Sequence, residues 1–176
     1  RDRDVTGVQT CALPILMNLD DFDRVEIMPD DLTLADRWIY SRLHLKTSEV
    51  TGLLEGYELG EAARRMYDFI WDDFCDWYIE LAKPRLFHPA DARARAVVQT
   101  VLCDVLMNIM KLLHPFMPFI SEEIYQYLPG HQETIMRDSW PVADQQRIDL
   151  KSIEEMQMVM SVIRAIRNIR AEFNLS

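Results

Sequence analysis

Residues 111–129, KLLHPFMPFISEEIYQYLP, hold the feature that decides the fold. A helical pattern runs into the two prolines of HPFMPF and resumes at SEEIYQYL. Because proline lacks a backbone N–H and clashes with the preceding turn, this run predicts a boundary or kink between two helices. We expect a stiff, buried corner that is lined by Leu112, Leu113, Phe116, Phe119 and Ile120.

Apolar residues recur at helical spacing on both sides of the corner. Upstream, Thr33 and Asp36 predict the start of a helix that ends at Gly56. A second helix is expected from about Leu59 until Pro84 stops it, and a third from HPADARA to about residue 113.

Downstream of the corner, a short helix is expected to about residue 127, and a last helix over about 152–173. The apolar residues of the last helix are expected to face inward: Ile153, Met156, Val159, Ile163 and Ile166. No long strand pattern occurs, so the sequence predicts an all-α fold, an antiparallel helical bundle.

The N-terminal stretch 1–15, RDRDVTGVQTCALPI, differs from the rest because it has no helical period. It resembles a translated sequencing adaptor, with a disordered tail as the alternative, and it lacks the apolar region of a signal peptide. We expect a cytoplasmic protein. Its parts are a non-native tail at 1–15, a helical bundle at 16–150 and a last helix at 151–176 that leads to a missing C-terminal region.

The composition limits the classes of function. Of the 176 residues, 49% are hydrophobic, which suffices for a core, and the net charge is −10. A free-standing nucleic-acid binder usually carries a basic field, so any contact with nucleic acid must rest on a local basic face. No apolar run reaches the roughly 18 residues that a membrane span needs, so we expect a soluble protein without a membrane partner.

The sequence carries no catalytic or metal-binding motif. It has no Gly-rich phosphate loop and no serine elbow. Its histidines do not alternate with a carboxylate at metal spacing, and its cysteines are too far apart for a zinc site. We therefore assign no catalytic residue and no metal ligand. His114, next to Pro115, is expected to cap the end of the third helix.

Charged residues crowd the stretch YDFIWDDFCDWYIELAKPRL, residues 67–86. We interpret them as a structural network of ion pairs with arginines on other helices, with direct substrate contact as the alternative. In the last helix, IRAIRNIR places Arg164, Arg167 and Arg170 at intervals of three residues, on one slowly rotating face. A solvated face is the usual meaning of such a stripe, and phosphate contact is the functional one.

Four stretches together resemble one family: LTLADRWIYSRL, the run YELGEAARRMYDFIWDDFCDWYIELAKPRL, LLHPFMPFISEEIYQYLP and IRAIRNIRAEFNLS. They are similar to the helical anticodon-binding domain of valyl-tRNA synthetases, which are class I enzymes. The resemblance covers residues 16–176. The proline corner is shared with isoleucyl and leucyl enzymes, whereas FCDWYIELAKPRL points to the valyl group.

The resemblance implies a parent enzyme that attaches valine to tRNA-Val, with ATP and Mg²⁺ in a catalytic domain that carries HIGH and KMSKS motifs. Neither motif occurs here, so this chain is expected to be an inactive fragment without a cofactor. Its expected partners are tRNA-Val and the catalytic and editing domains of the same polypeptide. The adaptor-like stretch stands where the first helix of the bundle belongs, which leaves the anticodon surface incomplete.

Two groups of residues are candidates for tRNA binding. The first group is chosen by position on the first two helices, and the second by charge on the last helix. The candidates are Arg37, Arg42, Lys83 and Arg85, and then Arg164, Arg167 and Arg170. Two other interpretations stay open: the same domain of an isoleucyl enzyme, and a stand-alone helical interaction module without an RNA role.

Overall fold

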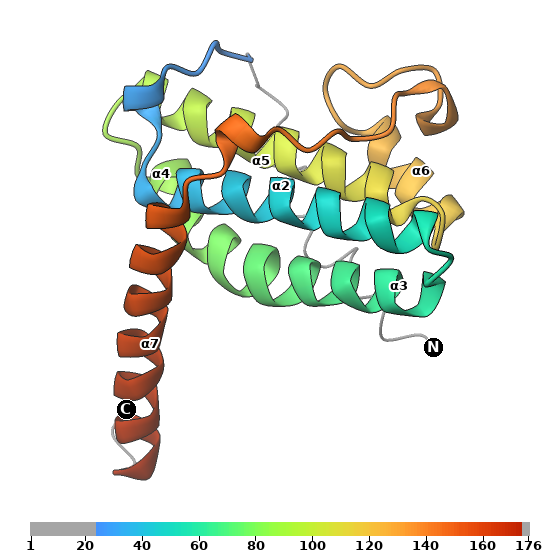
Figure 1. Ribbon diagram of the computed structural model, residues 1–176. Helices are drawn as coiled ribbons and strands as arrows, with labels where there is room; N and C mark the ends of the chain where they lie inside the picture. Colours follow the sequence, from blue (N-terminus) through green and yellow to red (C-terminus); the bar gives the residue numbers. More distant parts are fainter. Residues whose placement is uncertain (1–23, 174–176) are drawn as a thin grey trace.

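The computed structural model describes residues 24–173, so the expected tail at 1–15 lies outside the described residues. Over residues 24–173 the chain forms helices and no strand, which confirms the all-α expectation. Figure 1 shows long helices that lie side by side, with chain neighbours antiparallel, and one C-terminal helix that leaves the bundle at its edge.

The first long helix is α2 (Leu34–Glu55), and its start and end follow the expected signals. Asp36 N–H donates to Thr33 Oγ1, and Thr33 N–H donates to the Asp36 carboxylate at 2.9 Å, which forms a capping box. Gly56 follows the last residue of the helix. A short 3₁₀ turn, η1 (Pro29–Asp31), precedes α2.

The second long helix combines α3 (Leu59–Asp68), η2 (Phe69–Ile79) and α4 (Glu80–Phe87). The middle part, η2, is a π-helix, in which each backbone hydrogen bond spans one more residue than in an α-helix. The expectation that Pro84 stops this helix was wrong, because Pro84 lies inside α4. The turn beyond it is held by tertiary contacts, since Leu86 is buried and Arg85 is paired with Asp36.

The central helix is α5 (Ala92–Leu113), with Asp91 as its N-cap. Among the described residues, it is the one helix long and apolar enough to cross a membrane, with a mean hydropathy of 1.6 in its most apolar window. From the sequence we expected no apolar run of this length, because we counted only uninterrupted apolar residues. However, 72% of that window is buried inside the protein, which is the arrangement of a core helix.

The proline corner joins α5 to α6 (Pro118–Gln126), and Pro118 is the first residue of α6. Leu112 and Leu113 are buried as expected, but Phe119 is 91% exposed and Phe116 is half-buried. Phe119 points outward because the first turn of α6 presents Pro118 and Phe119 to solvent and buries Ser121. His114 is the C-cap residue of α5, and its backbone N–H donates to the carbonyls of Met110 and Lys111. Its ring does not contact these carbonyls; Nδ1 lies 2.8 Å from Ser121 Oγ and ties the corner to α6.

A long segment returns from α6 to the start of α7 (Leu150–Glu172). It contains two 3₁₀ turns, η3 (Ile135–Arg137) and η4 (Gln145–Arg147), and Trp140 Nε1 donates to Thr51 Oγ1 on α2 at 3.0 Å. The N-terminal half of α7 packs on the body, where Ile153, Met156 and Met160 are buried and Ile163 is partly buried against the core. The expectation that Val159 and Ile166 face inward was wrong, because α7 projects beyond the bundle and exposes both side chains.

Candidate nucleic-acid interface

The basic stripe of α7 begins where this helix passes Trp77 of η2. The guanidinium carbons of Arg164 and Arg167 lie 5.5 and 5.6 Å from the centroid of the Trp77 ring. The ring itself is only 8% exposed, so its buried body anchors the contact to the core. Two arginines are thus held by cation–π contacts beside the bundle, with their N–H groups still available.

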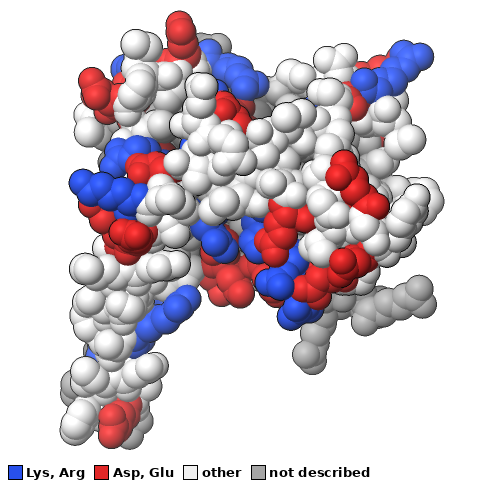
Figure 2. All heavy atoms as spheres, in the orientation of Figure 1, with Lys and Arg blue, Asp and Glu red and all other residues white. Residues whose placement is uncertain are grey.

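No carboxylate within residues 24–173 neutralises this stripe. Arg164, Arg167 and Arg170 are exposed, and none of them forms an ion pair with a described acidic residue. Figure 2 shows basic atoms on the flank of α7 that faces the bundle, and both acidic and basic atoms on the underside of the bundle across from it. The stripe is therefore a local positive surface on an acidic chain.

Arg85 is placed very differently, because its guanidinium is committed to Asp36. Its two terminal nitrogens donate to the two carboxylate oxygens of Asp36 at 2.7 and 2.6 Å. The hydroxyl of Tyr78 donates to the same carboxylate at 2.7 Å, and Asp36 is 0% exposed. Burial acts to raise the pKa of Asp36, but the hydrogen bond and charge of Arg85 outweigh it and hold this pKa below its usual value.

The remaining candidates on the first helices are also paired. Arg42 forms an ion pair with Asp73 of η2 at 2.8 Å. Lys83 pairs with Glu80 one turn earlier in the same helix and stays half-exposed. The interpretation of residues 67–86 as part of a structural network is confirmed for the Asp73 and Arg85 pairs.

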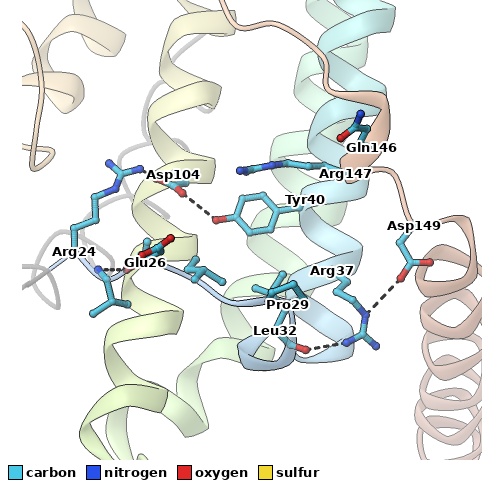
Figure 3. A pocket seen from close by; sticks show the side chains of 13 residues that line it. Arg24, Glu26, Pro29, Leu32, Arg37, Tyr40, Asp104, Gln146, Arg147 and Asp149 are labelled. Atoms are coloured by element: carbon cyan, nitrogen blue, oxygen red, sulfur yellow. Dashed lines mark hydrogen bonds and ion pairs between the residues drawn. The ribbon is translucent and has the colours of Figure 1, made fainter.

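Arg37 lies apart from these pairs, at the rim of a cavity of about 590 Å³. The cavity lies between the segment before η1, α2, α5 and η4, and its rim and floor include Arg24, Tyr40, Asp104 and Arg147. Figure 3 shows Arg147 lying along Tyr40, whose hydroxyl points to Asp104, while Arg37 points away to Asp149. Three arginines from distant parts of the chain therefore meet at one cavity.

The described residues contain no cluster of three histidine, cysteine or acidic side chains that could hold a metal ion. The basic stripe of α7 and the cavity beside Arg37 instead place guanidinium groups next to aromatic rings. Such pairs suit planar groups and phosphate oxygens, which guanidinium can bind with two parallel hydrogen bonds.

Comparison with known proteins decides the family. The family model described as the anticodon-binding domain of tRNA ligase matches residues 36–176. The chain is 50% identical over 163 residues to the valine–tRNA ligase of Carboxydothermus hydrogenoformans, which covers 92% of this chain and 18% of that protein. It is 46% identical over 161 residues to the valine–tRNA ligase of Thermotoga maritima, with coverages of 92% and 18%. The chain belongs to the family of anticodon-binding domains of tRNA ligases.

A solved structure shares the fold of this anticodon-binding domain. It is the LeuRS of Agrobacterium radiobacter K84 in a ternary complex with tRNA and LeuAMS, with a TM-score of 0.57 and 22% sequence identity. The match covers 82% of this chain and 16% of that one. The domain thus spans about a fifth or less of the length of these relatives.

Sequence patterns singled out Arg37, which lies at the cavity, but gave no signal for Tyr40, Asp104 and Arg147. These residues come from α2, α5 and η4, and no spacing along the chain connects them. Arg147 lies in a long polar segment without a regular pattern, so only the fold reveals its contact with Tyr40. The arginines of α7 were detectable, because one helix repeats them at a regular interval.

Proposed function

We propose that this chain is the part of a valine–tRNA ligase that binds the anticodon region of tRNA-Val. The names of the curated relatives, which are valine–tRNA ligases, support this proposal over an isoleucyl enzyme. In the proposed parent, ATP and Mg²⁺ serve the attachment of valine in a separate catalytic domain. The catalytic and editing domains of the same polypeptide are the proposed protein partners, and the cytoplasm is the proposed location.

One observation carries the proposal: the unneutralised arginines of α7, two of which are fixed against Trp77. RNA carries one negative charge at each phosphate, and basic side chains that contact phosphates supply much of the affinity. The cation–π contacts orient the guanidinium groups before RNA arrives, so less side-chain freedom is lost on binding.

A second candidate function is a helical interaction module. Its support is an apolar stripe on the projecting part of α7, where five exposed residues follow one another at intervals of three and four: Val159, Val162, Ile166, Ile169 and Phe173. Such spacing is that of a helix that packs against another helix. In this case the arginines of α7 serve solubility, and their removal leaves tRNA binding unchanged.

The test is the affinity of the 176-residue chain for a tRNA-Val transcript, measured by fluorescence anisotropy at several salt concentrations. The triple variant Arg164→Ala, Arg167→Ala, Arg170→Ala should bind more weakly. Its slope of log affinity against log salt should fall by about 2, because about 0.7 counterions are released per phosphate contact on single-stranded RNA.

The matched control removes the same charge from other surfaces: Arg64→Ala, Arg137→Ala, Lys151→Ala, all highly exposed in the structure. The proposal predicts that this control keeps most of the affinity and of the salt slope. Equal losses in the two triple variants would reduce the role of α7 to net charge and contradict the proposal.

A further inference from the structure

The cavity beside Arg37 has a platform for a flat ligand. The guanidinium carbon of Arg147 lies 5.7 Å from the centroid of the Tyr40 ring, which is a cation–π contact. Its carboxylate contact, to Asp144, is long at 3.7 Å, and the side chain is 59% exposed. This half-exposed guanidinium is therefore accessible to a planar group that enters the cavity.

Tyr40 cannot turn away from this position, because its hydroxyl donates to Asp104 Oδ2 at 3.0 Å. The other carboxylate oxygen of Asp104 accepts a hydrogen bond from Arg24. Burial raises the pKa of Asp104, although Arg24 opposes this effect. The Asp104 carboxyl group lines the cavity and can accept a hydrogen bond from an amino group on the edge of a planar ligand.

Another wall of the cavity is formed by the segment before α2, which contributes the apolar Val25, Ile27, Pro29 and Leu32 and one acidic residue, Glu26. At the rim, Arg24 is 56% exposed. Arg37 is half-exposed; it donates to the Leu32 carbonyl at 2.8 Å and lies 3.4 Å from the Asp149 carboxylate. A ligand that matches these features has a flat ring, an amino or imino edge and an attached phosphate. The volume of about 590 Å³ lies in the range of small-molecule sites, which is roughly 300–1,000 Å³.

We propose that this cavity takes one unstacked nucleotide of a single-stranded RNA loop, with the base on Arg147, its edge at Asp104 and its phosphate at Arg24 and Arg37. Proteins read loop bases in this manner, by stacking on aromatic rings or guanidinium planes and by hydrogen bonds to base edges. The inference rests on the proposed tRNA function and adds a second contact to it, separate from the arginines of α7.

The experiment uses a stem-loop RNA with the tRNA-Val anticodon loop and the fluorescent base 2-aminopurine at one loop position at a time. Binding of the full chain should change the fluorescence at one position, because that base leaves its neighbours and stacks on Arg147. Arg147→Ala should abolish this change and weaken binding by about tenfold, as expected for loss of one stacked base. Arg147→Lys keeps the charge but offers no flat face, so it should also abolish the change.

The control is Arg137→Ala, which removes an exposed arginine of the same long segment that lies outside the lining of the cavity. It should keep both the fluorescence change and the affinity, and circular dichroism checks that every variant is folded. Full binding and an unchanged fluorescence response in Arg147→Ala would overturn the inference while leaving the proposed function in place.

Two further outcomes distinguish failure of the proposed tRNA function from binding of a free nucleotide. If the chain binds neither the stem-loop nor intact tRNA-Val at any salt concentration, the proposed function fails and the inference fails with it. The last measurement tests the binding of free adenosine and cytidine monophosphates. If they bind in an Arg147-dependent manner while the stem-loop does not compete, the ligand is a free nucleotide and the assignment to an RNA loop is wrong.

Discussion

Asp36 joins two helices through one buried carboxylate. It caps α2 through Thr33 and also receives both terminal nitrogens of Arg85 and the hydroxyl of Tyr78. Every oxygen of the carboxylate is thus satisfied in a site from which water is excluded. A buried charge of this kind is stable only while its partners remain, because an unpaired ion in the interior is costly.

We predict that Arg85→Ala lowers the free energy of unfolding by about 3–5 kcal/mol, the usual cost of removing one partner of a buried ion pair. Urea denaturation measures this change. The control is Lys83→Ala, because Lys83 is exposed near Arg85 and its pair with Glu80 contributes at most about 1 kcal/mol. Similar losses for the two variants would contradict the structural role of Arg85.

A second prediction concerns acid. The pKa of folded Asp36 lies below its unfolded value, so its contribution to stability is present above about pH 4 and is lost as the pH falls through the folded pKa. The wild-type chain should therefore lose more unfolding free energy than Asp36→Asn between about pH 5 and pH 2. Denaturant titrations over this interval measure the difference. Parallel pH profiles of the two proteins would refute this account.

At the scale of residues, sequence patterns identified the capping pair of Thr33 and Asp36, because capping is local. They did not identify Arg85 as its partner, since 49 positions separate Arg85 from Asp36. By position and charge alone, Arg85 was a candidate for tRNA binding. Only the fold shows that its guanidinium is already committed.

At the scale of elements, helix starts and ends followed local signals except at Pro84. Proline is disfavoured inside a helix by about 3 kcal/mol, yet the helix continues to Phe87 because the last turn is held by Leu86 and Arg85. Tertiary contacts thus outweighed a local rule. The π-helical segment was equally hidden, since helical periodicity alone does not distinguish it from an α-helix.

Trp77 connects η2 to α7, and we predict that Trp77→Ala lowers the unfolding free energy by about 3–5 kcal/mol. The reason is the loss of a buried indole that also carries Arg164 and Arg167. Thermal unfolding measures the effect. Trp140→Ala is the matched control, because Trp140 is partly exposed on the long segment and should cost much less. An unchanged melting temperature in Trp77→Ala would contradict the prediction.

The two halves of α7 should respond differently to truncation. Met156 is buried against the body, so Met156→Ala should cost about 2–5 kcal/mol. Ile166 is exposed on the projecting half, so Ile166→Ala should change the stability by about 0.5 kcal/mol or less. Urea denaturation compares the two variants. A large cost for Ile166→Ala would show that this half packs on the body.

At the scale of the whole molecule, an acidic chain combines arginines with aromatic rings at two places. One is the flank of α7 at Trp77, and the other is the cavity with Arg147. The resemblance of the sequence to valyl-tRNA synthetases predicted the fold and the family. It did not predict the cavity, because that site depends on how the segment before η1 and the turn η4 meet α2 and α5.

The most direct measurement is the binding of the purified chain to a tRNA-Val transcript and to the same transcript with its anticodon replaced, at two salt concentrations. The account predicts tighter binding to the valine anticodon, and a preference that persists at the higher salt concentration because base contacts depend little on salt. Equal binding of the two transcripts at both salt concentrations would contradict the claim that this chain recognises the anticodon.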